Sequence, residues 1–197
     1  MSGYNLKRIY TKQRYTPILL KQNFSILYER YIMVLNLKRT ISAVDSKNIE
    51  LFSDAYLDET ISLLYNSYED PVNKLIFGEP NKSRFKKELE DLLSDRKNLE
   101  FLSDNSFVSL IDNKVVGIVI VGKYLEKPMI FELAVNKQFQ GRGIGRQLLV
   151  KSILTLQDRY TELLLMVTKG NKKAENLYRS MGFKKIAENL VVLEKGV

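Results

Sequence analysis

The sequence has 197 residues, 45% of them hydrophobic and 27% charged, which are ordinary values for a globular protein with a sizeable core. It contains neither cysteine nor histidine, which excludes disulfides, zinc–thiolate sites, a cysteine nucleophile and the commonest general base. No apolar run reaches membrane-spanning length and no signal peptide opens the chain, so we expect a cytoplasmic protein without a metal and without membrane association.

The net charge of +8 is unevenly distributed along the chain. Residues 1–48 carry a net charge of +7, residues 49–104 a net charge of −6 and residues 105–197 a net charge of +7. Such asymmetry reflects partners of the opposite charge or solvated helix faces, and the sequence leaves both explanations open.

Residues 1–48 are the least regular part of the chain. Basic residues and tyrosines alternate over residues 4–15, as in an arm that contacts nucleic acid, although no known nucleic-acid motif accompanies them. Residues 24–35 fit the spacing of a helix, whereas residues 31–37 fit a strand equally well. A further interpretation is that Met33 is the true start and that the preceding segment is an extension without a catalytic part.

From residue 49 onward the sequence predicts regular elements. A short strand over residues 49–52 precedes a helix over 55–68 that ends at Asp70-Pro71, and Asn81 is the predicted N-cap of a second helix. Strands over 107–111 and 115–123 follow, joined by a tight turn, and then a strand over 129–135 and a long helix from residue 145. A strand over 163–168, predicted to be buried on both faces, precedes a helix over 171–181 that Gly182 ends. The last two strands are predicted over 183–187 and 190–193, around a turn at 188–189. This order predicts an α/β (α+β) fold in which a mixed sheet carries helices on both faces.

Residues 131–149 read as a strand, a glycine-rich turn and a helix. Gly141, Gly143 and Gly145 lie where the helical pattern begins. The first amides of a helix lack internal partners and glycine lets a ligand approach them, so we expect a phosphate or pyrophosphate at this turn. A tight turn that only lets helix and strand pack closely is the alternative. The spacing matches neither a P-loop nor a dinucleotide-binding fingerprint.

The turn instead fits the pattern Gln/Arg-x-x-Gly-x-Gly/Ala, and a second motif, Asn-x-x-Ala-x-x-x-Tyr-x-x-x-Gly-Phe, covers residues 171–183. Together the two motifs resemble the GNAT superfamily of acyl-CoA-dependent N-acetyltransferases. The resemblance covers residues 49–194, so we expect a GNAT domain over 49–197 and a basic, tyrosine-rich N-terminal extension over 1–48. It implies a GNAT-like, mostly antiparallel sheet of about six or seven strands.

The resemblance also implies where acetyl-CoA binds. Its pyrophosphate is expected on the loop of residues 140–146, and its pantetheine arm beside the end of the strand over 129–135. The cofactor-binding residues so implied are Leu133, Ala134, Val135, Gln140, Gly141, Arg142, Gly143, Ile144, Gly145, Arg146, Asn171, Ala174 and Tyr178.

Three residues have implied catalytic roles in the direct attack of a primary amine on the thioester within a ternary complex. The Val135 amide polarises the thioester carbonyl, and Tyr178 protonates the departing thiolate. Glu132, the one charged residue in its strand, is the predicted general base. The alternatives are an edge-exposed Glu132, a Glu132 that only binds the substrate ammonium, and a Tyr178 that is an ordinary core residue.

The acceptor amine is not identified by any motif. The net charge of −6 over residues 49–104 suggests a cationic acceptor, such as a polyamine, an amino sugar or a protein amino group. The alternative function is a catalytically silent acyl-CoA-sensing or partner-binding module, associated with nucleic acid through residues 1–48. A homodimer is left open, because the oligomeric state is not readable from the sequence.

Overall fold

The computed structural model of the chain describes residues 8–38, 41–42, 47–69, 74, 79–94, 100–186 and 189–195. Its strands are β1 (Arg8–Lys12), β2 (Phe24–Asn36), β3 (Ile49–Leu51), β4 (Glu100–Phe101), β5 (Phe107–Ile111), β6 (Lys114–Tyr124), β7 (Lys127–Val135), β8 (Glu162–Thr168), β9 (Lys184–Lys185) and β10 (Leu190–Lys195). The helices are α1 (Thr16–Leu20), α2 (Leu57–Ser67), α4 (Lys82–Leu93), α5 (Ile144–Leu156) and α6 (Lys172–Ser180). None of these described helices is long and apolar enough to cross a membrane.

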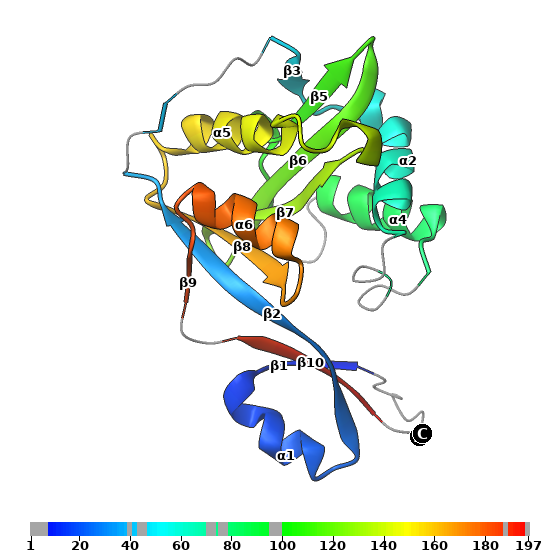
Figure 1. The fold of residues 1–197 in the computed structure, drawn as a ribbon, viewed down its shortest axis with the longest axis vertical. Coiled ribbons are helices and arrows are strands. Elements are labelled where there is room, and N and C mark those ends of the chain that lie inside the picture. The colour runs from blue at the N-terminus through cyan, green and yellow to red at the C-terminus, as the bar shows by residue number, and fades with distance from the viewer. Residues whose placement is uncertain are drawn as a thin grey trace.

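One sheet runs through the molecule (Figure 1). Its strand order is β1-β10-β2-β8-β7-β6-β5-β3, with β4 paired to β6 and β9 paired to β2. Among the described strands only β7 and β8 pair in parallel, which confirms the predicted mixed, mostly antiparallel sheet. The sheet has ten strands, more than the six or seven expected, because the N-terminal segment adds β1 and β2 and residues 100–101 add the short β4.

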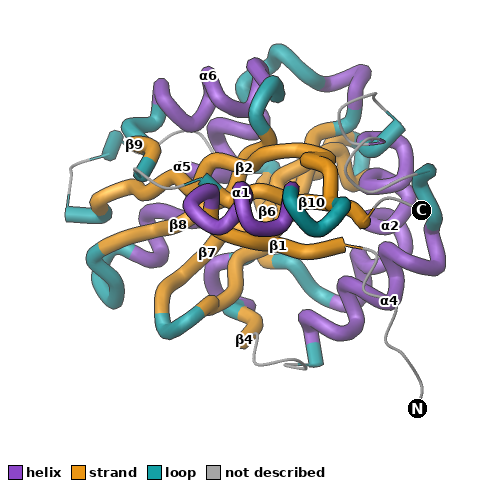
Figure 2. Tube along the Cα trace, turned by 90° about the horizontal axis from the view of Figure 1, so that it is seen from below, coloured by secondary structure: helices purple, strands orange, loops and turns teal. Residues whose placement is uncertain are grey.

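Strand β6 separates two hydrophobic cores, since successive residues of a strand face opposite sides. Val119 and Val121 pack with α5 and α6, whereas Ile118 and Ile120 pack with α2 and α4. Viewed from below, α6 and α4 accordingly lie on opposite sides of the sheet (Figure 2). The predicted helices on both faces are therefore confirmed.

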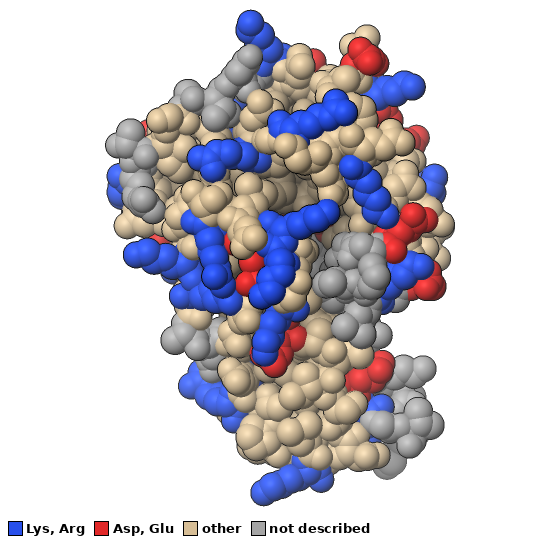
Figure 3. Space-filling model, in the orientation of Figure 1, with Lys and Arg blue, Asp and Glu red and all other residues tan. Residues whose placement is uncertain are grey.

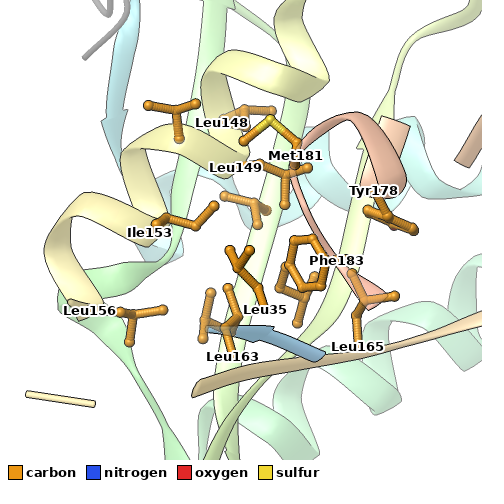
Figure 4. Close-up of a cluster of buried hydrophobic side chains, with 14 of the residues drawn as sticks. Leu35, Leu148, Leu149, Ile153, Leu156, Leu163, Leu165, Tyr178, Met181 and Phe183 are labelled. Carbon is orange, nitrogen blue, oxygen red and sulfur yellow. The ribbon is translucent and has the colours of Figure 1, made fainter. Parts of the chain in front are cut away.

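The larger core lies between α5 and the middle of the sheet. In Figure 4, Leu148, Leu149 and Ile153 of α5 face Leu35 of β2 and Leu163 of β8. All five of these side chains are fully buried. The amphipathic spacing after residue 145 therefore predicted the α5 face correctly.

Most local predictions from residue 49 onward are confirmed. The side-chain oxygen of Asn81 accepts a hydrogen bond from the Arg84 amide at 3.0 Å, as an N-cap does. Asp112 and Asn113 have φ values of 50° and 57°, which is the geometry of a tight hairpin turn between β5 and β6. The predicted stop at Asp70-Pro71 and residue 188 of the predicted last turn lie outside the described residues.

Residues 24–36 form a strand, so the helical alternative for this segment is wrong. Met33 and Leu35 are fully buried, and β2 is hydrogen-bonded between β10 and β8. The segment before residue 48 is thus continuous with the sheet. In Figure 1, β1, α1 and β10 lie with one end of β2 at the lower end of the molecule. Nucleic-acid binding by this segment stays a prediction.

Two further strand predictions are corrected. The final strands do not form a hairpin with each other, because β9 and β10 both pair with β2. The strand over residues 163–168 is not buried equally on both faces, since Leu163, Leu165 and Val167 are buried but Leu164 and Met166 are only partly so.

Candidate active site

Strands β7 and β8 separate soon after they meet. They pair at Met129 with Leu164 and at Ile130 with Leu165, and no later pair joins them in the described part of the chain. A β-bulge lies at this point, because the pairing of β7 with β6 passes from Ile130 directly to Glu132. Bulges bend a strand and change the direction of its side chains, and they are frequent beside active sites. The sheet therefore opens into a gap after Ile130.

The bulge directs two consecutive side chains of β7 to the same face of the sheet. Phe131 and Ala134 pack with the core of α2 and α4, whereas Leu133 and Val135 pack with the core of α5 and α6. Glu132, between Phe131 and Leu133, is hydrogen-bonded to Tyr68 at the C-terminal end of α2. Its carboxylate therefore lies on the α2 and α4 face of the gap.

The end of β7 directs backbone amides toward the gap. The Asn136 amide donates to the Val116 carbonyl at 2.8 Å, and in an antiparallel pair the neighbouring residue points its amide the other way. The Val135 N–H is thus on the side of β8. The side-chain amide of Gln140 donates to the Val135 carbonyl at 3.0 Å, which ties the start of the glycine loop to this strand end.

The glycine loop requires glycine for its backbone conformation. Gly141 and Gly143 have φ values of 81° and 82°, in the left-handed region, and a Cβ at either position would have no atom within 4 Å. The α5 helix starts at Ile144 without a side-chain cap, whereas the Asn171 side chain caps α6 by accepting from the Ala174 amide at 3.2 Å. The α5 N-terminus therefore offers its amides to open space, as an anion site needs.

The elements of this site converge at Gly145. A Cβ on Gly145 would lie 3.5 Å from Leu177 of α6 and 3.6 Å from Val135 of β7. Beside it, the Arg146 guanidinium donates to the Ser180 hydroxyl at 3.4 Å, and the Arg142 guanidinium lies over the Phe139 ring. Figure 3 shows lysines and arginines gathered over α6 on this face, with acidic groups toward α4.

Tyr178 lies on the α6 side of the gap with 7% of its surface exposed. Its ring packs edge-on against Phe183, with ring centroids 5.8 Å apart. Its hydroxyl makes no hydrogen bond to the described residues. Burial raises the pKa of Tyr178, the charge of Glu132 raises it further, and Arg30 lowers it. The phenol is thus neutral and keeps its proton at physiological pH.

Glu132 lies on the opposite face and is partly buried. Its two carboxylate oxygens accept from the Tyr68 hydroxyl at 2.7 and 2.9 Å. Burial raises the pKa of Glu132 to about 7, with the charge of Glu88 also raising it, while the Tyr68 hydrogen bond and the Arg30 charge lower it. A carboxylate with this pKa is half protonated at neutral pH and is suited to accept a proton.

Tyr68 and Arg30 are site residues that the sequence did not reveal. Tyr68 is 64 positions from Glu132, at the end of the helix predicted over residues 55–68. Arg30 lies before the region of the resemblance, and its guanidinium donates through Nη2 to the Met166 carbonyl at 3.2 Å. No spacing or motif connects either residue with Glu132.

Comparison with known sequences gives a consistent result. The model of the acetyltransferase (GNAT) domain family matches residues 103–185. Two curated relatives are ribosomal protein bS18-alanine N-acetyltransferases. The protein from Haemophilus influenzae is 28% identical over 75 residues, which cover 38% of this chain and 51% of that protein. The protein from Salmonella typhimurium is 37% identical over 73 residues, which cover 36% of this chain and 49% of that protein. Another is the spermidine N(1)-acetyltransferase of Escherichia coli K12 (26% over 132 residues, 64% and 63%). The chain spans about half the length of the first two proteins.

Solved structures resemble the whole fold. A GCN5-related N-acetyltransferase from Sphaerobacter thermophilus matches with a TM-score of 0.70 and 16% identity, over 96% of this chain and 60% of that one. A ribosomal-protein alanine N-acetyltransferase from Escherichia coli matches with a TM-score of 0.54 and 21% identity, over 75% of this chain and 91% of that one. At such identities these likenesses establish the fold alone.

Proposed function

We propose that this chain, which belongs to the GNAT superfamily, transfers an acetyl group from acetyl-CoA to a primary amine. The observation that carries the proposal is the gap between β7 and β8, with a carboxylate of pKa about 7 on one face and a neutral buried phenol on the other. Acid and base groups on opposite sides of one opening are what a ternary-complex transfer needs.

The residues around the gap fit an acyl-CoA donor. The uncapped start of α5 and the open space over Gly141 and Gly143 suit a diphosphate, and the Leu133 and Val135 amides suit an extended amide-bearing arm. Gln140, Arg142, Ile144, Gly145 and Arg146 complete this binding surface, with Ala134, Asn171, Ala174 and Tyr178 beside it. Bound there, acetyl-CoA supplies an acetyl group activated as a thioester.

Three groups of the chain then do the chemistry. An amine is protonated at neutral pH, and Glu132 accepts its proton so that the nitrogen lone pair can form the bond to the acetyl carbon. The Val135 N–H donates a hydrogen bond to the acetyl oxygen as negative charge develops there. Tyr178 gives its proton to the sulfur as the carbon–sulfur bond breaks, and its phenolate takes the second proton that the nitrogen loses on becoming an amide, while Glu132 releases the first proton to solvent.

Thiol release in the presence of acetyl-CoA and a panel of amines tests the proposal. We expect release that depends on the amine, together with heat of coenzyme A binding in calorimetry. Heat without thiol release from any amine would favour the silent acyl-CoA-binding module. An absence of both signals would overturn the proposed function altogether.

A further inference from the structure

We propose that the acceptor carries a carboxylate next to its reacting amine, as an amino acid does, and that Arg30 binds this carboxylate. The inference rests on the proposed function, because it names the acceptor class of the same site. Arg30 would then be a specificity-determining residue supplied by the segment before the region of the resemblance.

The fold places Arg30 on the acceptor face of the gap. Its strand neighbours Tyr31 and Met33 both pack with the core of α5 and α6. Because side chains alternate along a strand, Arg30 points to the other face, where Tyr68 and Glu132 lie. In the β2–β8 register Arg30 stands opposite Thr168, beyond the last pair that joins β8 to β7.

Arg30 has donors to spare for a ligand. A guanidinium carries five N–H groups, and the described residues provide one acceptor, the Met166 carbonyl. Its Nε is enclosed without a hydrogen-bond partner, and Arg30 forms no ion pair with any described carboxylate. Arg30 is partly buried, so a guanidinium with this few partners is costly, and a carboxylate that accepts hydrogen bonds from its terminal nitrogens would supply the missing acceptor.

Charges of both signs therefore share one face. The Glu132 carboxylate is held by Tyr68, and the Arg30 charge acts on it without an ion pair between the two groups. Glu88 of α4 adds a second negative charge near Glu132. A zwitterionic amino acid matches this arrangement, with its amine toward Glu132 and its carboxylate toward Arg30. A polyamine would place a cation against Arg30 instead.

The test compares each amino acid with its amide and with its decarboxylated amine, alongside a polyamine. The amide keeps the shape but loses the negative charge, and its amine is less basic, so easier deprotonation cannot explain a preference for the acid. We expect the wild type to favour the acids by at least tenfold in kcat/KM. Arg30→Gln should lower kcat/KM for the acids about 10²-fold more than for the amides, because any change that the lost charge makes in the pKa of Glu132 affects both kinds of acceptor alike. Arg159→Gln, on an exposed residue after α5, is the matched control.

A binding measurement makes the result independent of turnover. Calorimetry of amino acids with the coenzyme A complex should show heat that Arg30→Gln abolishes, while the heat of coenzyme A itself stays unchanged. Arg30→Lys, which keeps the charge but not the planar fork, should restore part of the preference if Arg30→Gln folds poorly.

Three outcomes would overturn the inference while leaving acetyl transfer intact. They are equal rates for acids and amides in the wild type, a uniform loss for every acceptor in Arg30→Gln, and a polyamine as the best acceptor. If no amine is acetylated, the proposed function fails instead, and the heat of amino acid binding still decides the role of Arg30.

Discussion

The hydroxyl of Tyr68 donates to both carboxylate oxygens of Glu132, at 2.7 and 2.9 Å, and so joins the end of α2 to the middle of β7. The donor hydrogen bond favours the charged form of Glu132 and opposes the effect of burial on its pKa. Burial has the larger effect on the pKa of Glu132, and the residue at the end of α2 reduces that effect.

Tyr68→Phe should consequently raise the pKa of Glu132 above about 7, because the hydrogen bond that lowers it is lost. The acidic limb of the pH–rate profile should move to higher pH by about one unit. A hydrogen bond to a charged group is worth ~1.5–3 kcal/mol, and the part of this energy that favours the charged over the neutral carboxyl gives the shift in pKa. The aromatic ring at position 68 keeps its edge-on packing against Phe85 in the variant. Tyr65→Phe on the same helix is the control, and an unmoved limb in Tyr68→Phe would contradict the assignment.

Glu132→Gln should remove the acidic limb and lower kcat by about 10²–10⁴-fold. In the wild type the rate should rise with pH through about 7, because only the deprotonated carboxylate accepts a proton. Steady-state rates from pH 5.5 to pH 9 on both proteins measure this effect. A limb that persists in Glu132→Gln would show that another group titrates.

The same substitution has an effect on stability that needs no substrate. The pKa of Glu132 is raised from 4.5 to about 7 in the folded state, so the folded protein binds more protons between these values and loses stability as pH rises through them. Glu132→Gln lacks this loss. Its free energy of unfolding, relative to wild type, should increase by ~1–3 kcal/mol between pH 4.5 and pH 8. Urea unfolding at both pH values checks the sign.

Tyr178→Phe should lower kcat by about 10²-fold while the heat of coenzyme A binding is retained. The ring keeps its packing against Phe183, so the fold should be preserved. Tyr160→Phe, at a partly buried tyrosine beyond the far end of α5, is the matched control. Turnover that survives Tyr178→Phe would refute the proton-donor role.

Gly143→Ala should destabilise the fold by ~1–2 kcal/mol, because its φ of 82° is strained for a residue with a Cβ. The added methyl group also enters the open space over the loop, so affinity for coenzyme A should fall at least about tenfold. Gly170→Ala, at φ 100°, carries the same backbone strain away from the loop and should keep its affinity. Equal affinities in the two variants would argue against a diphosphate at residues 140–146.

Leu35→Ala should cost ~2–5 kcal/mol of unfolding free energy, because Leu35 is fully buried between α5 and β8. Ile26→Ala, at a residue of the same strand that is 46% exposed, should cost less than ~1 kcal/mol. Denaturant unfolding of both variants tests whether β2 is an integral part of the folded core or an appended segment. A small loss of unfolding free energy in Leu35→Ala would favour an appended segment.

The parts of the fold that could be predicted are those with local chemical causes. The Asn81 cap, the Asp112-Asn113 turn and the glycine loop each depend on residues a few positions apart. The β7–β8 gap could be expected only through the family resemblance. The bulge that directs Glu132 toward Tyr68 depends on register with β6, which no local pattern encodes.

The N-terminal strand shows why the remainder was not predictable. Its partners β8, β9 and β10 lie far along the chain, and its buried and exposed residues do not alternate with a clean period of two. Arg30 belongs to this strand, so its place beside Glu132 could not be inferred before the pairing was known. The irregular pattern of the first 48 residues therefore gave no indication that Arg30 lies on the face of Glu132.

The position of β2 also bears on how the protein is made. This strand is synthesised early, yet its first sheet partner in the chain begins at Glu162. Until β8 has been synthesised, the main-chain groups of residues 24–36 lack their hydrogen-bond partners in the sheet, and the large apolar side chains lack their packing partners. These contacts between distant residues give the fold a high contact order, so we expect slow folding in which the sheet forms late. We also expect nascent chains to depend on a chaperone that shields this strand.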